Sequence, residues 1–171
     1  MHDNPKAQIT LRDGDSSPIL SGSAADLVAR GRKELADLAR RAQTLLQTRK
    51  RAEQGDAAAQ YELSLKMAED SEAASESLMW LGRAVDQGYA KAQYILGRMW
   101  LSAPFGESET AESEAAVWFR KAAEQGYAHA QYALGKALEE GRGLPQDSVE
   151  ASEWFRRAAN QGVFGLDGWQ P

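Results

Sequence analysis

Cysteine is absent from the 171-residue chain, so disulfide bonds, thiolate metal sites and cysteine nucleophiles are excluded. Histidine is almost absent: His2 and His129 alone are too few for a histidine-based zinc site. No apolar run approaches the roughly 18 residues of a transmembrane helix, and the N-terminus lacks the basic and apolar pattern of a secretory signal. We therefore expect a cytoplasmic protein that does not insert into membranes.

Recognisable catalytic motifs are also missing. The chain has no Walker glycine loop, no Gly-x-Ser-x-Gly elbow, no His-Glu-x-x-His and no Ser-x-x-Lys. Gly141-Arg142-Gly143 is too short for a dinucleotide-binding fingerprint and is explained by a turn. Acidic residues cluster without the ligand order and glycine of a calcium loop, at Glu107, Glu109, Glu112 and Glu114. We expect no catalytic residue, no cofactor and no metal.

Basic residues are fewer than acidic residues, 20 against 25. The net charge is −5, which argues against a general nucleic-acid binder. Residues 24–55 hold eight basic and four acidic residues, whereas residues 56–171 hold ten basic and 18 acidic residues. The basic segment and the acidic body are either two solvated surfaces or, alternatively, the basic segment docks an acidic partner.

What the chain has in abundance is repetition. Gln-Gly recurs at Gly55, Gly88, Gly126 and Gly162, with spacings of 33, 38 and 36 residues. Ala-Gln-Tyr follows three of these glycines, a tryptophan lies eight residues before three of them, and small or apolar residues recur between. The repeat positions are Gly55, Ala59, Leu63, Trp80, Gly88, Ala92, Leu96, Gly97, Trp118, Gly126, Ala130, Leu134, Gly135, Gly141, Gly143, Trp154 and Gly162.

Each repeat predicts two antiparallel helices. Helix A is expected near 56–69, 89–102 and 127–140, and helix B near 73–87, 111–125 and 147–161. The glycine ends helix B, Asp147 or Ser148 can cap the last one, and the small residues let the helices approach closely. One hairpin cannot bury its apolar face, so the fold class is all-α, a right-handed α-solenoid of about three helix pairs: 56–88, 89–126 and 127–162.

The coupled positions resemble the Sel1-like repeat family, relatives of tetratricopeptide repeats, over about residues 52–163. The quoted pattern is Gly-x-x-x-Ala-x-x-x-Leu-Gly, then Gly-x-Gly-Leu-x-x-Asp, then Ala-x-x-Trp-Phe-x-x-Ala-Ala-x-Gln-Gly. The third unit matches almost fully. The second has a longer loop without the double glycine, and the first has a shortened loop and Ser64 where glycine is usual.

The segments outside the repeats have different expected roles. Residues 1–20 show no periodicity and are expected to be flexible. Residues 163–171 form a C-terminal tail, and its Phe164, Leu166 and Trp169 are expected to cover the open face of the last hairpin. Residues 21–55 predict a long amphipathic helix, capped by Ser21 or Ser23, whose end caps the solenoid. The rest of that helix either folds back on the repeats or pairs with a partner or with itself.

The candidate binding surface is the concave groove formed by the A helices. Helical geometry at 100° per residue places one tyrosine of each repeat on this face, with basic residues nearby. The groove residues are Tyr61, Lys91, Tyr94, Arg98, His129, Tyr132 and Lys136. Tyrosine and arginine are frequent interface anchors, although the tyrosines are equally explained by packing between A helices.

The resemblance implies a non-catalytic module that binds another protein or peptide segment, as an adaptor or regulator of a complex. The alternative is an immunity-type inhibitor that neutralises a toxic effector. An enzyme is a third hypothesis, against which the missing cysteines weigh, since the relatives proposed as enzymes are cysteine-rich. Arginine exceeds lysine by 13 to 7, which hints at a bacterial source.

Overall fold

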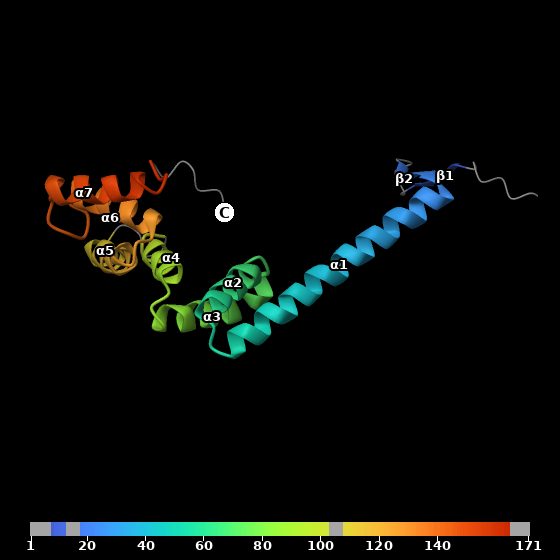
Figure 1. Ribbon diagram of the computed structural model, residues 1–171, viewed down its shortest axis with the longest axis horizontal. Helices are drawn as coiled ribbons and strands as arrows, with labels where there is room; N and C mark the ends of the chain where they lie inside the picture. The colour runs from blue at the N-terminus through green and yellow to red at the C-terminus, as the bar shows by residue number, and fades with distance from the viewer. Residues whose placement is uncertain (1–7, 13–17, 103–107, 165–171) are drawn as a thin grey trace, which may run out of the picture. The chain divides into compact units, whose positions relative to one another are not determined.

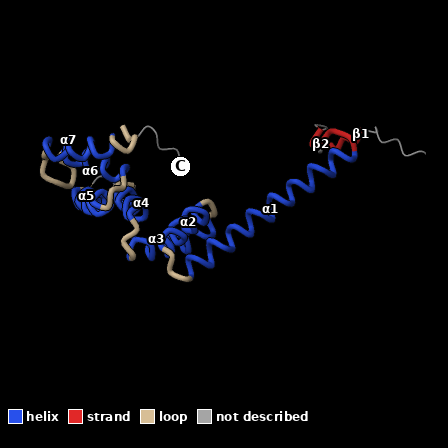
Figure 2. The backbone as a smooth tube through the Cα atoms, in the orientation of Figure 1, coloured by secondary structure: helices blue, strands red, loops and turns tan. Residues whose placement is uncertain are grey.

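The computed structural model describes residues 8–12, 18–102 and 108–164, with only the backbone described before Ser23. The chain divides into two compact units, residues 1–47 and 48–171, and each is described by itself. Figure 2 shows that helices dominate both units and that the strands are confined to one short hairpin. No helix in the described ranges is both long and apolar enough to span a membrane.

The first unit contains a β-hairpin and most of one long helix. Strands β1 (Gln8–Arg12) and β2 (Pro18–Ser23) pair antiparallel, with Gln8 opposite Ser23 and Leu11 opposite Leu20. The expectation that residues 1–20 form no regular structure is therefore wrong for the strand residues. The apolar–polar alternation of Gln-Ile-Thr-Leu-Arg is the period-two pattern that a strand favours. Residues 1–7 and 13–17 lie outside the described residues.

Helix α1 (Ala24–Glu53) begins as the sequence predicts. The Ser23 hydroxyl accepts a hydrogen bond from the Asp26 backbone N–H at 3.2 Å and donates one to the Asp26 carboxylate at 2.6 Å. This reciprocal pair satisfies backbone groups that a helix N-terminus leaves open. From Thr48 onward α1 belongs to the second unit, where Thr48 and Ala52 are buried. Its end therefore caps the first repeat.

The second unit consists of three helical hairpins (Figure 1). The A helices are α2 (Ala57–Ala68), α4 (Ala90–Trp100) and α6 (Ala128–Glu140), and the B helices are α3 (Ala74–Asp86), α5 (Glu109–Glu124) and α7 (Ser148–Ala159). A short 3-10 turn, Ser71–Ala73, joins α2 to α3. Each A helix packs along its own B helix, as in an α-solenoid, which confirms the predicted fold class.

The sequence explains where these helices begin and end. Asp56, Ser108 and Asp147 cap α2, α5 and α7, each accepting a hydrogen bond from a backbone N–H in the first turn. At the other end the Gln-Gly glycines take a left-handed conformation, for example φ of 77° at Gly88 and 88° at Gly126. This conformation lets the next N–H reach back into the helix, as Tyr89 N–H does to the Ala84 carbonyl at 3.0 Å.

Buried glutamines connect each A helix to the preceding helix and to the end of its own B helix. Gln60 Nε2 donates to the Ala52 carbonyl at 3.0 Å, and Gln131 Nε2 donates to the Ala123 carbonyl at 3.2 Å. The amide oxygens of Gln60, Gln93 and Gln131 accept hydrogen bonds from the glutamines of the following Gln-Gly pairs, Gln87, Gln125 and Gln161. Each Ala-Gln-Tyr glutamine therefore holds the end of its own helix B. Buried amides need such partners, so both glutamines recur together.

Small residues make room for aromatic rings inside each hairpin. A Cβ on Gly97 would lie 2.7 Å from the Phe119 ring, and one on Gly135 would lie 2.7 Å from the Phe155 ring. The first repeat has Ser64 at the glycine position and Leu81 at the phenylalanine position. The departure at Ser64 therefore accompanies a smaller side chain on the facing helix. The residues at the glycine and phenylalanine positions therefore change together, as close packing of the two helices requires.

Two residues are more exposed than the repeat pattern and the expected packing of the tail predict: Trp118 and Phe164. Trp80 and Trp154 are buried, but Trp118 is only partly buried. Phe164 is 80% exposed, so it does not cover the last hairpin, and the rest of the tail, residues 165–171, lies outside the described residues. Trp118 also differs from Trp80 and Trp154 in that its indole makes no hydrogen bond to a glutamate among the described residues.

Candidate protein-binding site

The seven residues predicted for the groove differ in accessibility. Lys91 is exposed, whereas Tyr94 is 2% exposed and belongs to the core. The remaining five are partly buried: Tyr61, Arg98, His129, Tyr132 and Lys136. Because of its burial, Tyr94 cannot act as an exposed anchor, and its truncation would cost stability as well as binding.

The tyrosines of Ala-Gln-Tyr pack against rings of neighbouring elements. Tyr61 lies 5.5 Å from Tyr89, Tyr94 lies 5.3 Å from Tyr127, and Tyr132 lies 5.3 Å from Phe155, measured between ring centroids. These distances are typical of tilted and edge-to-face aromatic pairs. All three tyrosines thus take part in packing inside the second unit.

His129 sits at the edge of the same aromatic cluster. Its ring centroid lies 5.5 Å from Tyr127 and 6.2 Å from Tyr94, and its Nδ1 atom is buried without a hydrogen-bond partner. No group of three or more histidine, aspartate or glutamate residues in the described part of the chain could hold a metal ion. His129 is thus a packing residue in this structure.

Burial shifts the ionisation of the clustered phenols. Desolvation raises the pKa of Tyr127 from 10.0 to about 12, with nearby tyrosines adding to the effect. Burial also raises the pKa of Tyr61 and of Tyr94, and a hydrogen bond from Arg98 partly opposes it at Tyr94. The phenols of Tyr61, Tyr94 and Tyr127 are therefore protonated and neutral at physiological pH.

Alkaline pH is expected to destabilise the fold through these tyrosines. Between pH 10.0 and about 12 the unfolded chain releases phenolic protons that the folded chain retains at Tyr127. Unfolding is then linked to proton release, so stability is complete below pH 10 and decreases as pH rises. Urea titrations at several alkaline pH values should show the loss. Tyr127→Phe should make it smaller, and an equal loss in this variant would contradict the assignment.

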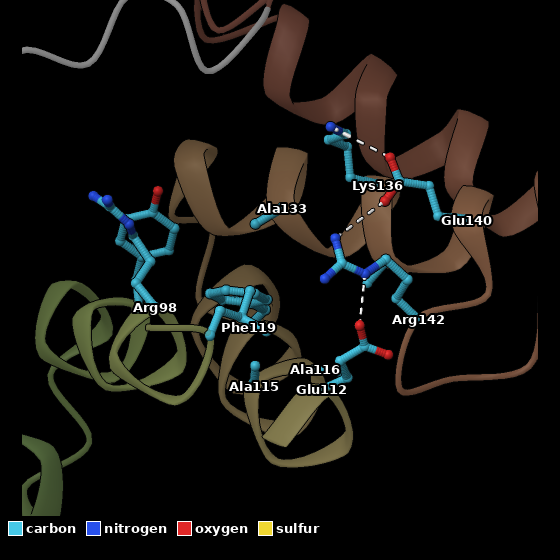
Figure 3. Close-up of a pocket in the computed structure, with 12 residues that line it drawn as sticks. Arg98, Glu112, Ala115, Ala116, Phe119, Ala133, Lys136, Glu140 and Arg142 are labelled. Atoms are coloured by element: carbon cyan, nitrogen blue, oxygen red, sulfur yellow. Dashed lines mark hydrogen bonds and ion pairs between the residues drawn. The ribbon is translucent and has the colours of Figure 1, made fainter. Parts of the chain in front are cut away.

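A hollow of about 220 Å³ lies between α4, α5 and α6. Figure 3 shows Phe119 at its centre, with Ala115 and Ala116 on one side and Ala133 on the other. These small side chains and the ring make an apolar floor. Phe119, Ala115 and Ala116 are themselves buried, so the floor of the hollow is part of the core, and apolar linings of this kind are typical of binding pockets.

Charged side chains surround this floor (Figure 3). Arg142 Nε lies 2.8 Å from the Glu112 carboxylate, and Lys136 Nζ lies 3.3 Å from Glu140. A second contact joins Arg142 to Glu140 at 3.6 Å, and the Glu112 carboxylate raises the pKa of Arg142. Arg98 completes the rim and hydrogen-bonds Tyr94. Among the described residues that line the hollow, three cations accompany two carboxylates.

The hollow brings together three of the seven predicted groove residues, Tyr94, Arg98 and Lys136. Tyr61, Lys91, His129 and Tyr132 do not line it. Sequence reasoning missed Phe119, Glu112 and Arg142 as parts of a site. The sequence predicts a turn at Gly141-Arg142-Gly143, and this turn places Arg142 on the rim.

Comparison with known proteins agrees with this architecture. Residues 57–89, 90–127 and 128–163 each match the family model of the Sel1 repeat. A crystal structure of a Sel1 repeat protein from Oxalobacter formigenes is 33% identical, with a TM-score of 0.62, and the match covers 70% of this chain and 91% of that chain.

A second similar structure is c5321, described as a protective antigen present in uropathogenic Escherichia coli strains displaying an SLR fold. It is 36% identical, with a TM-score of 0.58, and the match covers 70% of this chain but 26% of that chain. The matched region thus spans about a quarter of that protein. No curated protein matches the chain.

Proposed function

The chain belongs to the Sel1 repeat family, and from this membership we propose that it is an adaptor or regulator that assembles a cytoplasmic bacterial complex. Sel1 repeats are generally protein-interaction modules, typically without catalytic activity. The proposal assigns the binding surface to the hollow between α4, α5 and α6. The observation that carries this assignment is the apolar floor around Phe119, with three cations and two carboxylates among the described residues of its rim.

The proposed partner is a peptide segment that carries an apolar side chain next to a carboxylate. The apolar side chain would rest on Phe119 and the neighbouring alanines. The carboxylate would compete with Glu140 for Lys136, whose side chain is 43% exposed, and would approach Arg98. Exchange of one carboxylate for another costs little, because the cation stays paired.

Reversing the charge at Lys136 is expected to weaken capture of the partner at least tenfold, equal to about 1.4 kcal/mol. The variant is Lys136→Glu, and the matched control is Lys91→Glu, an exposed lysine on α4 outside the hollow. The measurement is quantitative affinity capture from host cells, with the melting temperature of each variant as a folding check. Equal capture by both variants would contradict the site.

The same captured material distinguishes an adaptor from an immunity-type inhibitor. An adaptor is expected to co-purify with a complex that keeps its activity. An inhibitor would hold one toxic effector in stoichiometric amount, and Lys136→Glu would then release the toxicity.

A further inference from the structure

One arrangement of arginine, glutamate and tryptophan occurs twice in the second unit, once between α1 and α3 and once between α5 and α7. Arg49 near the end of α1 contacts the Glu76 carboxylate on α3 at 3.0 Å, and Glu76 accepts a hydrogen bond from Trp80 Nε1 at 3.2 Å. The same oxygen of Glu76 makes both contacts. The Glu76 carboxylate therefore links an arginine of α1 to the tryptophan of its own helix.

The last pair of B helices repeats this arrangement. Arg120 on α5 contacts Glu150 on α7 at 2.7 Å, and Glu150 accepts from Trp154 Nε1 at 3.0 Å. The hydrogen bond from Arg120 lowers the pKa of Glu150. In both copies a further arginine lies over the tryptophan ring, with Arg83 at 4.6 Å and Arg157 at 4.4 Å from the centroid.

The middle junction, between α3 and α5, lacks the arginine that pairs with the glutamate, and a lysine replaces the arginine over the tryptophan ring. Glu114 and Trp118 occupy the glutamate and tryptophan positions, and Lys121 lies 4.0 Å over the Trp118 ring. The arginine position, six residues before the Gln-Gly glycine at Arg49 and Arg120, is held by Gly82. Among the interactions of the described residues, none involves the Glu114 carboxylate, which is exposed.

A side chain at position 82 would leave the helix without meeting a neighbour. No neighbouring atom lies within 4 Å of the position that a Cβ on Gly82 would take. Trp118 packs on Leu81 and its neighbours in the core, yet it is more exposed than Trp80 and Trp154. The contact of α3 with α4 is also less extensive than the contact of α5 with α6. The middle junction thus offers a carboxylate and an indole, with glycine at the arginine position.

Exposed apolar side chains accompany Gly82 and Glu114 on their helices. Leu78, on the helix face of Gly82 and one turn before it, is 53% exposed, and Val117, three residues after Glu114, is 46% exposed. Glutamate and indole together suit a guanidinium, which pairs with carboxylates in a fixed plane and stacks on aromatic rings. Lysine cannot reproduce that planar geometry.

We propose that the face formed by Gly82, Glu114 and Trp118 is a second binding site, which takes an arginine side chain from another protein. The guanidinium occupies the place that Arg49 and Arg120 hold at the two intact junctions. Apolar residues beside that arginine rest on Leu78 and Val117. The occupant is therefore a basic, amphipathic segment, opposite in charge to the occupant of the hollow, and the site is independent of the proposed function.

The test uses the full chain and N-acetyl-L-arginine amide as the probe, followed by two-dimensional NMR of the tryptophan indole N–H groups. We expect a saturable shift of the Trp118 signal with a dissociation constant in the millimolar range. N-acetyl-L-lysine amide should bind at least fivefold more weakly. The indoles of Trp80 and Trp154 are internal controls, since arginines already fill their junctions.

Three variants make the test specific. Gly82→Arg should supply the missing arginine internally, abolish the Trp118 shift and raise the melting temperature by a few degrees. Gly82→Ala, the matched control, should keep the shift, and Glu114→Gln should weaken it at least fivefold. The proposal is overturned by the absence of a saturable Trp118 shift, by equal binding of the lysine amide, or by an unchanged shift in Gly82→Arg.

Discussion

Replacing Trp154 by alanine is expected to lower the free energy of unfolding by about 3–5 kcal/mol, the range for truncating a buried aromatic side chain. Trp154 is 6% exposed and packs in the largest core cluster, with Tyr94 and Phe119. Its loss leaves a cavity and removes the indole donor to Glu150, which also binds Arg120. Urea denaturation followed by circular dichroism measures the change without relying on tryptophan fluorescence.

Trp118→Ala is the matched control for this substitution. Its side chain occupies the same repeat position but is partly exposed and has no hydrogen bond among the described residues. It should therefore cost about half as much. Equal losses at Trp118 and Trp154 would show that the middle junction is packed like the others, and would remove the structural basis of the arginine site.

Gly143→Ala is expected to have the second large effect, about 3 kcal/mol or more. Gly143 has φ of 70°, which costs a residue with a Cβ about 1–2 kcal/mol. A Cβ would also collide with the backbone of Glu112 and Ser113, which cannot move without shifting α5. Because Glu112 holds Arg142, this substitution should open the rim of the hollow as well.

Gly141→Ala isolates the conformational part of this cost. Gly141 has φ of 68°, but its nearest contact would be an ordinary one, 3.4 Å from the Gln146 Cβ. We expect a loss of about 1–2 kcal/mol for this control. Thermal unfolding of both variants measures the difference, and similar losses would contradict the close packing of the Gly143 turn on α5.

The repeats could be predicted from sequence because the signals of each helix recur. The Gln-Gly glycines, the capping residue Asp147 and the coupled tryptophans fix the helix ends to within a few residues. The buried alanines at Ala59, Ala92 and Ala130 are completely inaccessible, as close helix packing requires. Three independent copies of one pattern identify such a fold more firmly than any single motif.

The site was harder to predict, because periodicity does not distinguish a face that packs from a face that binds. The sequence predicts that one tyrosine of each repeat lies on the binding face of its A helix, yet Tyr94 belongs to the core and Tyr61 packs on Tyr89. The hollow depends on Phe119 from a B helix and Arg142 from a loop, which helix-face reasoning about the A helices does not include. The roles of the glutamine pairs and of Gly82 could not be predicted, because they depend on contacts between helices that are distant in the sequence.

The most direct measurement of the central claim is site-specific photo-crosslinking in host cells. A photoreactive residue at Lys136 reports on the hollow, and one at Leu38 reports on the N-terminal helix, whose apolar stripe is the competing surface. We expect the partner to be crosslinked from position 136, on the rim of the hollow. Crosslinking from position 38 alone, with none from position 136, would contradict this expectation and assign the interface to the N-terminal helix.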